Sequence, residues 1–324
     1  MRSCELPVGQ QDLAKHRRRL RDKLPTMNAS HVHLLLASDL HLEAGHYDLR
    51  GQIARLLDAG RRIDAVILAG DIVDSRRGDP VEYAAEQVPS EIPVAFVPGN
   101  HDFYGARFET LLEQWKAGAQ GSNISVLTEA TLAVRNPAGA EVVLVGTPLW
   151  SNLQSLGPVV EADLRRNLPR YIADFSHMVA SNRSPWTVAH HLAQFERAER
   201  FLVRELSPAA LEDGRRRVVV THFGPHRQSI TPRWRHSGVS AYFSSHLPEL
   251  VERADLWLHG HTHDGFEYQV GEDPCRGRVI CHPRGYAGGP EKPQAMAYSP
   301  KLIEVPVNRM PWPEFSPADT ELRH

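Results

Sequence analysis

Short apolar runs in this sequence end in side chains that can bind metal ions. In the first, His33–Glu43, the apolar residues are followed by Asp39 and His41. A carboxylate and an imidazole two residues apart lie on the same side of an extended backbone, so both can reach one ion. Such a triplet is common on its own, and Asp39 could equally be a turn former at a strand end. The pattern carries weight because it recurs along the chain.

Four more apolar runs end in the same kind of side chain. These candidate ligands follow the runs at residues 65–69, 93–97, 217–220 and 256–258, and they are Asp71, Asn100, His222, and His261 with His263. A mixture of imidazole nitrogens and side-chain oxygens suits borderline divalent metals such as Mn, Fe, Zn, Co or Ni. Seven ligands are too many for one ion. They predict two ions that share a carboxylate, about 3.5–4 Å apart, as in two-metal hydrolytic sites.

Two divalent ions at such a site have the chemistry that hydrolysis of phosphate esters requires. They neutralise the negative charge that repels hydroxide, and they lower the pKa of a bridging water, which then attacks phosphorus in line. A nearby imidazole can assist the departing alkoxide, which typically contributes about 10²–10⁴-fold to the rate. Gly70, Gly99 and Gly260 precede three of the ligands and let the backbone turn tightly beside the ions.

The spacing of the ligands indicates the elements that must position them. Asp39 and Asp71 are 32 residues apart, and Asp71 and Asn100 are 29 apart. A strand–helix–strand unit takes about 30 residues, so the three runs are predicted to be strands of one sheet, joined by helices at 48–60 and 80–88. The carboxyl ends of such strands form the edge at which open α/β sheets bind ligands.

A helical segment interrupts the strands in the middle of the chain. Residues 151–210 contain no comparable apolar run and are predicted to form helices, as a cap or insertion over the site. Strands are expected to resume at 217–220 and to continue to a closing strand at 301–307. Residues 1–30 are expected to be a peripheral extension, in which Met27 could be the native start. A loose tail at 311–324 leaves 31–310 as one domain.

Bulk composition limits the possible partners and compartments. With 41% hydrophobic and 23% charged residues, the 324-residue chain resembles an ordinary globular protein. A net charge of −2 gives no overall basic field, so long nucleic acid is not an expected partner. Three scattered cysteines favour a reducing compartment, and no apolar run reaches the roughly 20 residues of a bilayer span. We therefore expect a cytoplasmic protein without a membrane partner.

Taken in order, the ligand blocks resemble those of the calcineurin-like metallophosphoesterases. The blocks are DLH at 39–41, GD at 70–71, GNHD at 99–102, His222 after a strand, and GHTH at 260–263. The resemblance covers about residues 32–307. It implies an α/β fold of the α+β type, in which a two-sheet β-sandwich and its flanking helices make four layers, with the helical insertion at 151–210.

The resemblance also implies a role for each residue. Asp39, His41 and His263 would hold the first metal ion, Asn100, His222 and His261 the second, and Asp71 would bridge both. His101 would face the phosphate and stabilise or protonate the leaving oxygen, with Asp102 orienting its ring. Arg284, Tyr286 and His226 are the candidate substrate contacts, since arginine is a natural partner for phosphate oxygens and an aromatic ring can stack on a planar group.

The sequence thus predicts a dinuclear metal-dependent phosphoester hydrolase, and a phosphodiesterase on small or nucleotide substrates in particular. A phosphomonoesterase or protein phosphatase with the same site is the alternative. A non-catalytic scaffold is a remote alternative, because all seven ligands and His101 are present. The sequence departs from the family after His222, where many bacterial relatives read T-H-H or T-H-x-P and this chain has Phe223. This leaves the substrate contacts beside the second ion open.

Overall fold

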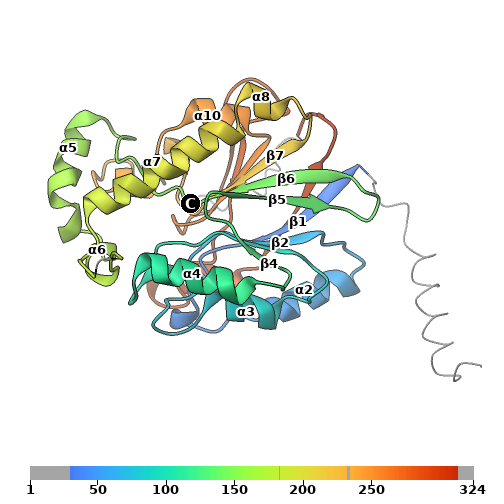
Figure 1. Ribbon diagram of the computed structural model, residues 1–324, viewed down its shortest axis with the longest axis horizontal. Coiled ribbons are helices and arrows are strands. Elements are labelled where there is room, and N and C mark those ends of the chain that lie inside the picture. Colours follow the sequence, from blue (N-terminus) through green and yellow to red (C-terminus); the bar gives the residue numbers. More distant parts are fainter. Residues whose placement is uncertain (1–29, 182, 232–233, 313–324) are drawn as a thin grey trace, which may run out of the picture.

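The computed structural model describes residues 30–181, 183–231 and 234–312. Two β-sheets pack face to face, and helices cover their outer faces (Figure 1). The first sheet has the strand order β11-β1-β2-β3-β4, and the second has the order β5-β6-β7-β8-β10-β9. The four-layer sandwich implied by the family resemblance is therefore confirmed. The possible start at Met27 and most of the predicted C-terminal tail lie outside the described residues.

The strands mostly follow the predicted apolar runs. The first sheet contains β1 (His31–Ala37), β2 (Ala65–Leu68), β3 (Val94–Phe96), β4 (Ile124–Val126) and β11 (Lys301–Pro306). The second contains β5 (Ala130–Arg135), β6 (Glu141–Gly146), β7 (Arg216–Val220), β8 (Leu256–His259), β9 (Phe266–Gln269) and β10 (Arg278–Cys281). Two strands, β4 and β5, were not predicted. β4 has only three residues, and β5 is an edge strand in which Val134 alone is buried.

The parallel strands explain why the ligands meet. β1, β2, β3 and β4 run parallel to one another, as do β6, β7 and β8 in the second sheet. The carboxyl ends of β1, β2 and β3 therefore lie along one edge, as their spacing predicted. Both faces of these strands are buried. Leu34 and Leu36 enter the core between the sheets, whereas Leu35 packs in the layer between sheet and helices.

The helices form the two outer layers. α2 (Leu49–Asp58), α3 (Pro80–Gln87) and α4 (Phe108–Ala119) cover the first sheet (Figure 1). α7 (Val188–Glu205), α8 (Pro208–Leu211) and α10 (Pro248–Arg253) cover the second. α3 shows how the sequence starts such a helix, since Pro80 fixes the first turn and the Asp79 carboxylate accepts from the N–H groups of Val81 and Glu82. In the described segments, no helix has the length and apolar character needed to cross a membrane.

The predicted helical insertion divides into two parts. α5 (Pro158–Asn167) and α6 (Asp174–His177) project at one end of the sandwich, whereas α7 lies along the second sheet (Figure 1). Phe195 and Leu202 of α7 belong to the same buried cluster as Val145 and Val219. α7 is thus one of the covering helices, and the projecting segment is shorter than 151–210. The remaining short helices are α9 (Ser240–Phe243) and α11 (Lys292–Ala297).

Candidate metal centre

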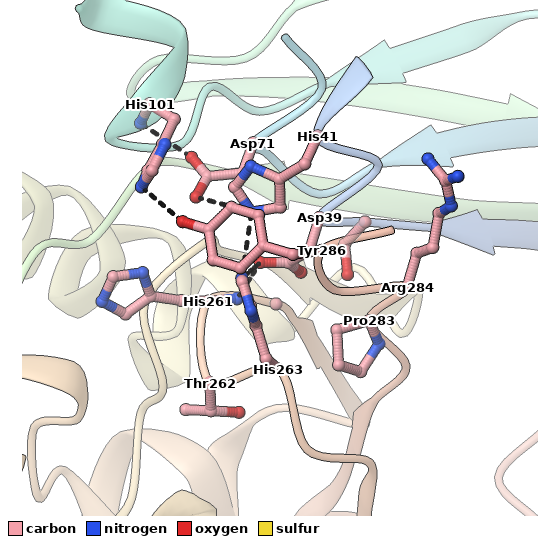
Figure 2. Close-up of polar contacts among 12 residues, drawn as sticks. Asp39, His41, Asp71, His101, His261, Thr262, His263, Pro283, Arg284 and Tyr286 are labelled. Carbon is pink, nitrogen blue, oxygen red and sulfur yellow. Dashed lines mark hydrogen bonds and ion pairs between the residues drawn. The ribbon is translucent and has the colours of Figure 1, made fainter. Parts of the chain in front are cut away.

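Loops of both sheets bring all seven predicted ligands together, and Figure 2 labels all of them except Asn100 and His222. They form two clusters, in each of which the potential ligand atoms lie within 4.8 Å of one another. One contains Asp39, His41 and His263, and the other Asp71, His222 and His261. The seventh residue joins the second cluster, because Asn100 Oδ1 lies 3.1 Å from His222 Nε2.

Asp71 lies between the two clusters. Its Oδ2 is 3.7 Å from His41 Nε2 and 3.3 Å from His222 Nε2. Burial opposes ionisation of this carboxyl, but the surrounding imidazoles, His222 foremost, hold its pKa well below the usual range. An ionised carboxylate oxygen that faces both clusters is in the place of a bridging ligand.

Two carboxylates fix the imidazoles of the first cluster. His41 Nδ1 is 2.8 Å from Glu43 Oε1, and His263 Nδ1 is 2.8 Å from Glu291 Oε2. When a neutral imidazole donates a hydrogen bond from Nδ1–H to a carboxylate, its Nε2 carries a lone pair, which here points into the cluster. Sequence reasoning missed both carboxylates. Glu43 had a local signal two residues after His41, whereas the fold alone brings Glu291 to His263.

The second cluster is held differently. His222 Nδ1 lies 2.9 Å from the carbonyl oxygen of Ala69, so a main-chain acceptor takes the place of a carboxylate. Burial lowers the pKa of His222, but the Asp71 carboxylate outweighs it and raises the pKa to about 9. Burial lowers the pKa of His261 well below its usual value. An ion that binds here must therefore displace a proton from His222 and finds His261 already neutral.

Buried polar atoms that lack a hydrogen-bond partner indicate whether metal ions fit this site. Asp39 Oδ2 and His261 Nε2 are buried without a hydrogen-bond partner among the described residues. The Nε2 atoms of His41 and His263 are 2.9 Å apart, although each ring already has a carboxylate at Nδ1. Facing nitrogens and orphaned oxygens are costly unless a cation lies among them. The residues therefore fit a pair of divalent ions of the type that accept nitrogen and oxygen ligands.

The backbone at the strand ends is bent to aim these side chains. Five of the seven ligands have left-handed backbone angles, with φ of 52° at Asp39, 43° at His41, 53° at Asp71, 73° at His261 and 54° at His263. Each such residue costs roughly 1–3 kcal/mol, and Asp and His are among the types that tolerate this region best. Strain concentrated at one strand-end cluster is typical of a functional site.

Glycines let the ligand loops approach one another closely. A Cβ atom added to Gly260 would lie 2.4 Å from Asp39 Oδ2, and one added to Gly70 would lie 2.4 Å from His222 Nδ1. Gly70 also has a positive φ of 84°, so it supplies the predicted turn. Gly260 is needed for the close approach of the two loops.

His101 faces the cavity in front of the two clusters. It starts the short 3₁₀ turn His101–Phe103 that follows β3, and its peptide N–H donates to Asp71 Oδ1 at 2.8 Å. Its Nε2 lies 3.4 Å from the hydroxyl of Tyr286 (Figure 2), and its Nδ1 lies 3.9 Å from Glu43 Oε1. The tyrosine ring also packs on His41, at 4.3 Å between ring centroids. Tyr286 thus lines the cavity beside His101, and its role as a substrate contact stays a prediction.

Asp102 does not orient the ring of His101, and that part of the prediction is wrong. Both carboxylate oxygens of Asp102 accept from main-chain N–H groups, at 2.8–3.0 Å, and the donors are Asp71, Ile72, Val73 and Gly99. Four converging peptide donors attract this carboxylate more than one imidazole would. Asp102 therefore fixes the loop that carries Asp71.

Two other predicted substrate contacts lie away from the cavity. Arg284 is buried and points away from the ligand clusters (Figure 2), donating to the carbonyl oxygens of Leu40, Gly45 and His46. The guanidinium pairs with carbonyl oxygens of the loop after β1 and does not reach the cavity. The predicted contact between Arg284 and phosphate is therefore wrong. His226 is buried against His246, with ring centroids 4.5 Å apart. It is not among the described residues that line the cavity.

A cavity of about 640 Å³ opens from the ligand clusters. One end is formed by Asp71, Asn100, His101, His261 and His263. The rest is lined mainly by apolar and aromatic residues, which include Ile172, Ile230, Val239 and Phe243, with a few serines, threonines and acidic residues among them. Tyr171 and Trp234, which also line it, are more than half exposed. Phe223, which sequence analysis singled out, is fully buried and packs on His261 with 3.9 Å between ring centroids.

Asp174 is a further residue of the site that sequence reasoning missed. This buried carboxylate of α6 accepts a hydrogen bond from Asn100 Nδ2 at 2.9 Å. It also accepts from the hydroxyls of Tyr104 and Tyr242. Burial and the Asp174 charge raise the pKa of both tyrosines, which keeps them as donors. No local motif marked Asp174, because its partners are distant in sequence.

Comparison with known proteins bears on this arrangement. Residues 32–265 match the family model of the calcineurin-like phosphoesterases. Among solved structures, the chain is similar to a phosphopantetheinyl hydrolase from Mycobacterium tuberculosis, with a TM-score of 0.60 and 17% identity over 90% of this chain and 100% of that one. A dimetal phosphatase from Danio rerio matches with a TM-score of 0.41 and 18% identity over 81% of this chain and 90% of that one. Comparison with curated proteins gives no match.

Proposed function

From the premise that this chain belongs to the calcineurin-like phosphoesterase family and is a phosphoester hydrolase, we propose that it acts as a two-metal phosphodiesterase on small or nucleotide substrates. One observation carries the proposal. Asp71 joins two clusters of nitrogen and oxygen ligands, and both clusters open on a single cavity of about 640 Å³. That volume is in the range of small-molecule sites.

The residues that would hold the ions follow from the clusters. Asp39, His41 and His263 would hold the first ion, and Asn100, His222 and His261 the second, with Asp71 shared between them. When bound, the ions would supply positive charge for the phosphate oxygens and an activated water. The donor set suits Mn, Fe, Zn, Co or Ni.

His101 is the residue proposed to protonate or stabilise the leaving oxygen. Its ring faces the cavity, and its peptide N–H donates a hydrogen bond to Asp71 Oδ1. This bond fixes the position of His101 relative to the Asp71 carboxylate. Nε2 can hold a proton toward the cavity beside the Tyr286 hydroxyl, 3.4 Å away. Transfer of that proton to the departing oxygen would stabilise the alkoxide as the phosphorus–oxygen bond breaks.

The cavity walls support a diester with a planar or apolar part. The described residues that line the cavity include no lysine or arginine, so apart from the metal ions and the histidines none of them would offset the second charge of a monoester dianion. A diester carries a single negative charge at phosphorus, which suits such walls better. Tyr171 and Trp234, 58% and 54% exposed, offer ring faces on which a base or another planar group could stack.

Comparing two chromogenic esters tests the proposal. With the metal-loaded protein, we expect kcat/KM for bis-p-nitrophenyl phosphate to exceed that for p-nitrophenyl phosphate. The opposite preference would make the chain a phosphomonoesterase and would end the diesterase proposal. Cyclic nucleotides, linear dinucleotides and a phosphopantetheinyl ester complete the panel. The last is included because one protein of similar fold is a phosphopantetheinyl hydrolase, although its 17% identity supports the fold alone.

We further propose that the protein works in a reducing compartment such as the cytoplasm. Cys275 and Cys281 are free thiols in the structure, and Cys281 is buried beside the loop of His261. A buried thiol that is kept reduced suits such a compartment. Fractionation of native cells with an antibody to this chain would test the location, and recovery in a membrane or secreted fraction would contradict it.

A further inference from the structure

The carboxylate of Asp174 receives three side-chain donors beside the second ligand cluster. Asp174 is the first residue of α6 and is 1% exposed. Its Oδ1 accepts from Asn100 Nδ2 at 2.9 Å and from the Tyr104 hydroxyl at 2.6 Å. Its Oδ2 accepts from the Tyr242 hydroxyl. Three donors leave this buried carboxylate as an acceptor only.

An acceptor at this place decides the orientation of the Asn100 amide. Because Asp174 can only accept, the NH₂ end of the amide must face it, and the oxygen end then lies 3.1 Å from His222 Nε2. With the amide turned over, the NH₂ group would face the cluster. An amide nitrogen with two protons has no lone pair for an ion, so the second site would lose a ligand.

The segment that carries Asp174 is tied to the loop that carries Asn100. The N–H of Gly105 donates to the carbonyl oxygen of His177 at 3.0 Å, and the N–H of Phe108 donates to that of Val179 at 2.9 Å. These two main-chain bonds hold the end of α6 against the chain that follows Asn100. The position of Asp174 is therefore set by the backbone.

We propose that Asp174 is a positioning residue, which holds Asn100 Oδ1 toward the second metal ion, so that the projecting helical segment completes that ion's site. The proposal rests on the two-metal function proposed above. It assigns Asp174 no contact with the ions or with substrate. The proposed effect on the second ion passes through the amide of Asn100, and this separates it from a general structural role.

The first test is a Mn²⁺ titration of the metal-free full-length protein by calorimetry, without substrate. Asp174→Asn keeps the side-chain shape but removes the charge and one of the two acceptor oxygens, so Asn100 Nδ2 loses its charged acceptor and can instead meet another NH₂ group. We expect one of the two Mn²⁺ equivalents to bind about 10–100-fold more weakly, the usual effect of losing a residue that orients a ligand. Asn100→Ala should weaken the same equivalent. Wild-type binding of both equivalents, or equal weakening of both, would overturn the proposal.

A matched control lies in the same projecting segment. On α5, Asp163 Oδ1 accepts from Asn167 Nδ2 at 2.8 Å on the solvent side, so it forms the same pair of groups away from the cavity. Asp163→Asn should bind both equivalents as the wild type does.

An exchange of the two residues keeps the test decisive if Asp174→Asn fails to fold. In the double variant Asn100→Asp, Asp174→Asn, the amide at 174 can donate to the carboxylate at 100, whose other oxygen can face the ion. We expect this variant to fold and to bind two equivalents. A folded exchange variant that binds one equivalent would contradict the proposal. If the wild type itself bound fewer than two, the proposed function would fail with it.

Discussion

At the scale of single residues, the site separates the groups that hold ions from the group that holds a proton. His101 makes a main-chain bond to Asp71, while its ring contacts Tyr286 and packs against Tyr104, 4.4 Å away between ring centroids. Three of the ligand imidazoles, by contrast, have their Nδ1 atoms engaged: His41 by Glu43, His263 by Glu291 and His222 by a carbonyl oxygen. Removing the His101 ring should therefore leave the ligand clusters intact.

His101→Ala should keep both metal ions and lose turnover. We expect kcat to fall by about 10²–10⁴-fold, the usual contribution of a general acid. The loss should be smaller for a p-nitrophenyl ester than for an alkyl ester, because p-nitrophenolate departs without a proton. Metal analysis by mass spectrometry and steady-state kinetics check this. Unchanged turnover with alkyl esters would refute the role of His101.

Glu43→Gln should weaken one metal ion. The substitution removes the negative charge beside His41 Nδ1, and this makes His41 Nε2 a weaker metal ligand. We therefore expect one Mn²⁺ equivalent to bind about 10–100-fold more weakly. The equivalent affected should differ from the one that Asp174→Asn affects, and the double variant should weaken both. Glu113→Gln, on the exposed face of α4, serves as the control. Full affinity in Glu43→Gln would contradict the assignment.

At the scale of elements, short loops at the ends of buried strands build the site, and the projecting segment α5–α6 supplies part of the cavity wall. Sequence reasoning could find the strands because β1 and β2 are apolar on both faces, and the ligands because each follows such a run. It could not find Glu291 or Asp174, whose partners are joined to them only by tertiary packing. It placed α7 in the insertion because an amphipathic helix shows its apolar face but not what that face packs against.

Two exposed aromatic rings at the cavity offer a further prediction: Tyr171 lies in the projecting segment, and Trp234 lies in the loop between β7 and α9. Truncating Tyr171 or Trp234 to alanine should raise KM for bis-p-nitrophenyl phosphate by up to roughly tenfold and change kcat little. The reason is that stacking of about 0.5–1.5 kcal/mol would be lost equally from bound substrate and transition state. Val159→Ala on α5, where Val159 is 83% exposed and outside the cavity lining, is the control. An unchanged KM would remove these rings from the substrate site.

At the scale of the whole molecule, a buried histidine links stability to pH. His191 of α7 is fully buried where Trp150, Phe175 and Phe223 come together, and burial lowers its pKa to about 3. The folded protein thus keeps His191 neutral, whereas the unfolded chain takes up a proton once the pH falls below about 6.5. Its contribution to stability is present above that pH and is lost progressively as the pH falls toward 3.

Urea unfolding of the metal-free wild type and of His191→Gln checks this linkage. Between pH 7 and pH 5 the stability of the wild type relative to the variant should fall by about 2 kcal/mol. Chelator in both samples removes the separate effect of metal release from the ligand histidines. A difference that stays constant over this range would show that His191 does not stay neutral in the folded state.

The central claim, that two ions bound at the ligand clusters support phosphoester hydrolysis, is tested most directly by metal reconstitution. Metal-free protein is titrated with Mn²⁺ while hydrolysis of bis-p-nitrophenyl phosphate is followed in the same samples. We predict that the rate rises to a plateau at two equivalents per chain and that Asp71→Asn, which lacks the bridging carboxylate, shows no such rise. Two bound equivalents without hydrolysis of any ester in the panel, or undiminished hydrolysis in excess chelator, would contradict the claim.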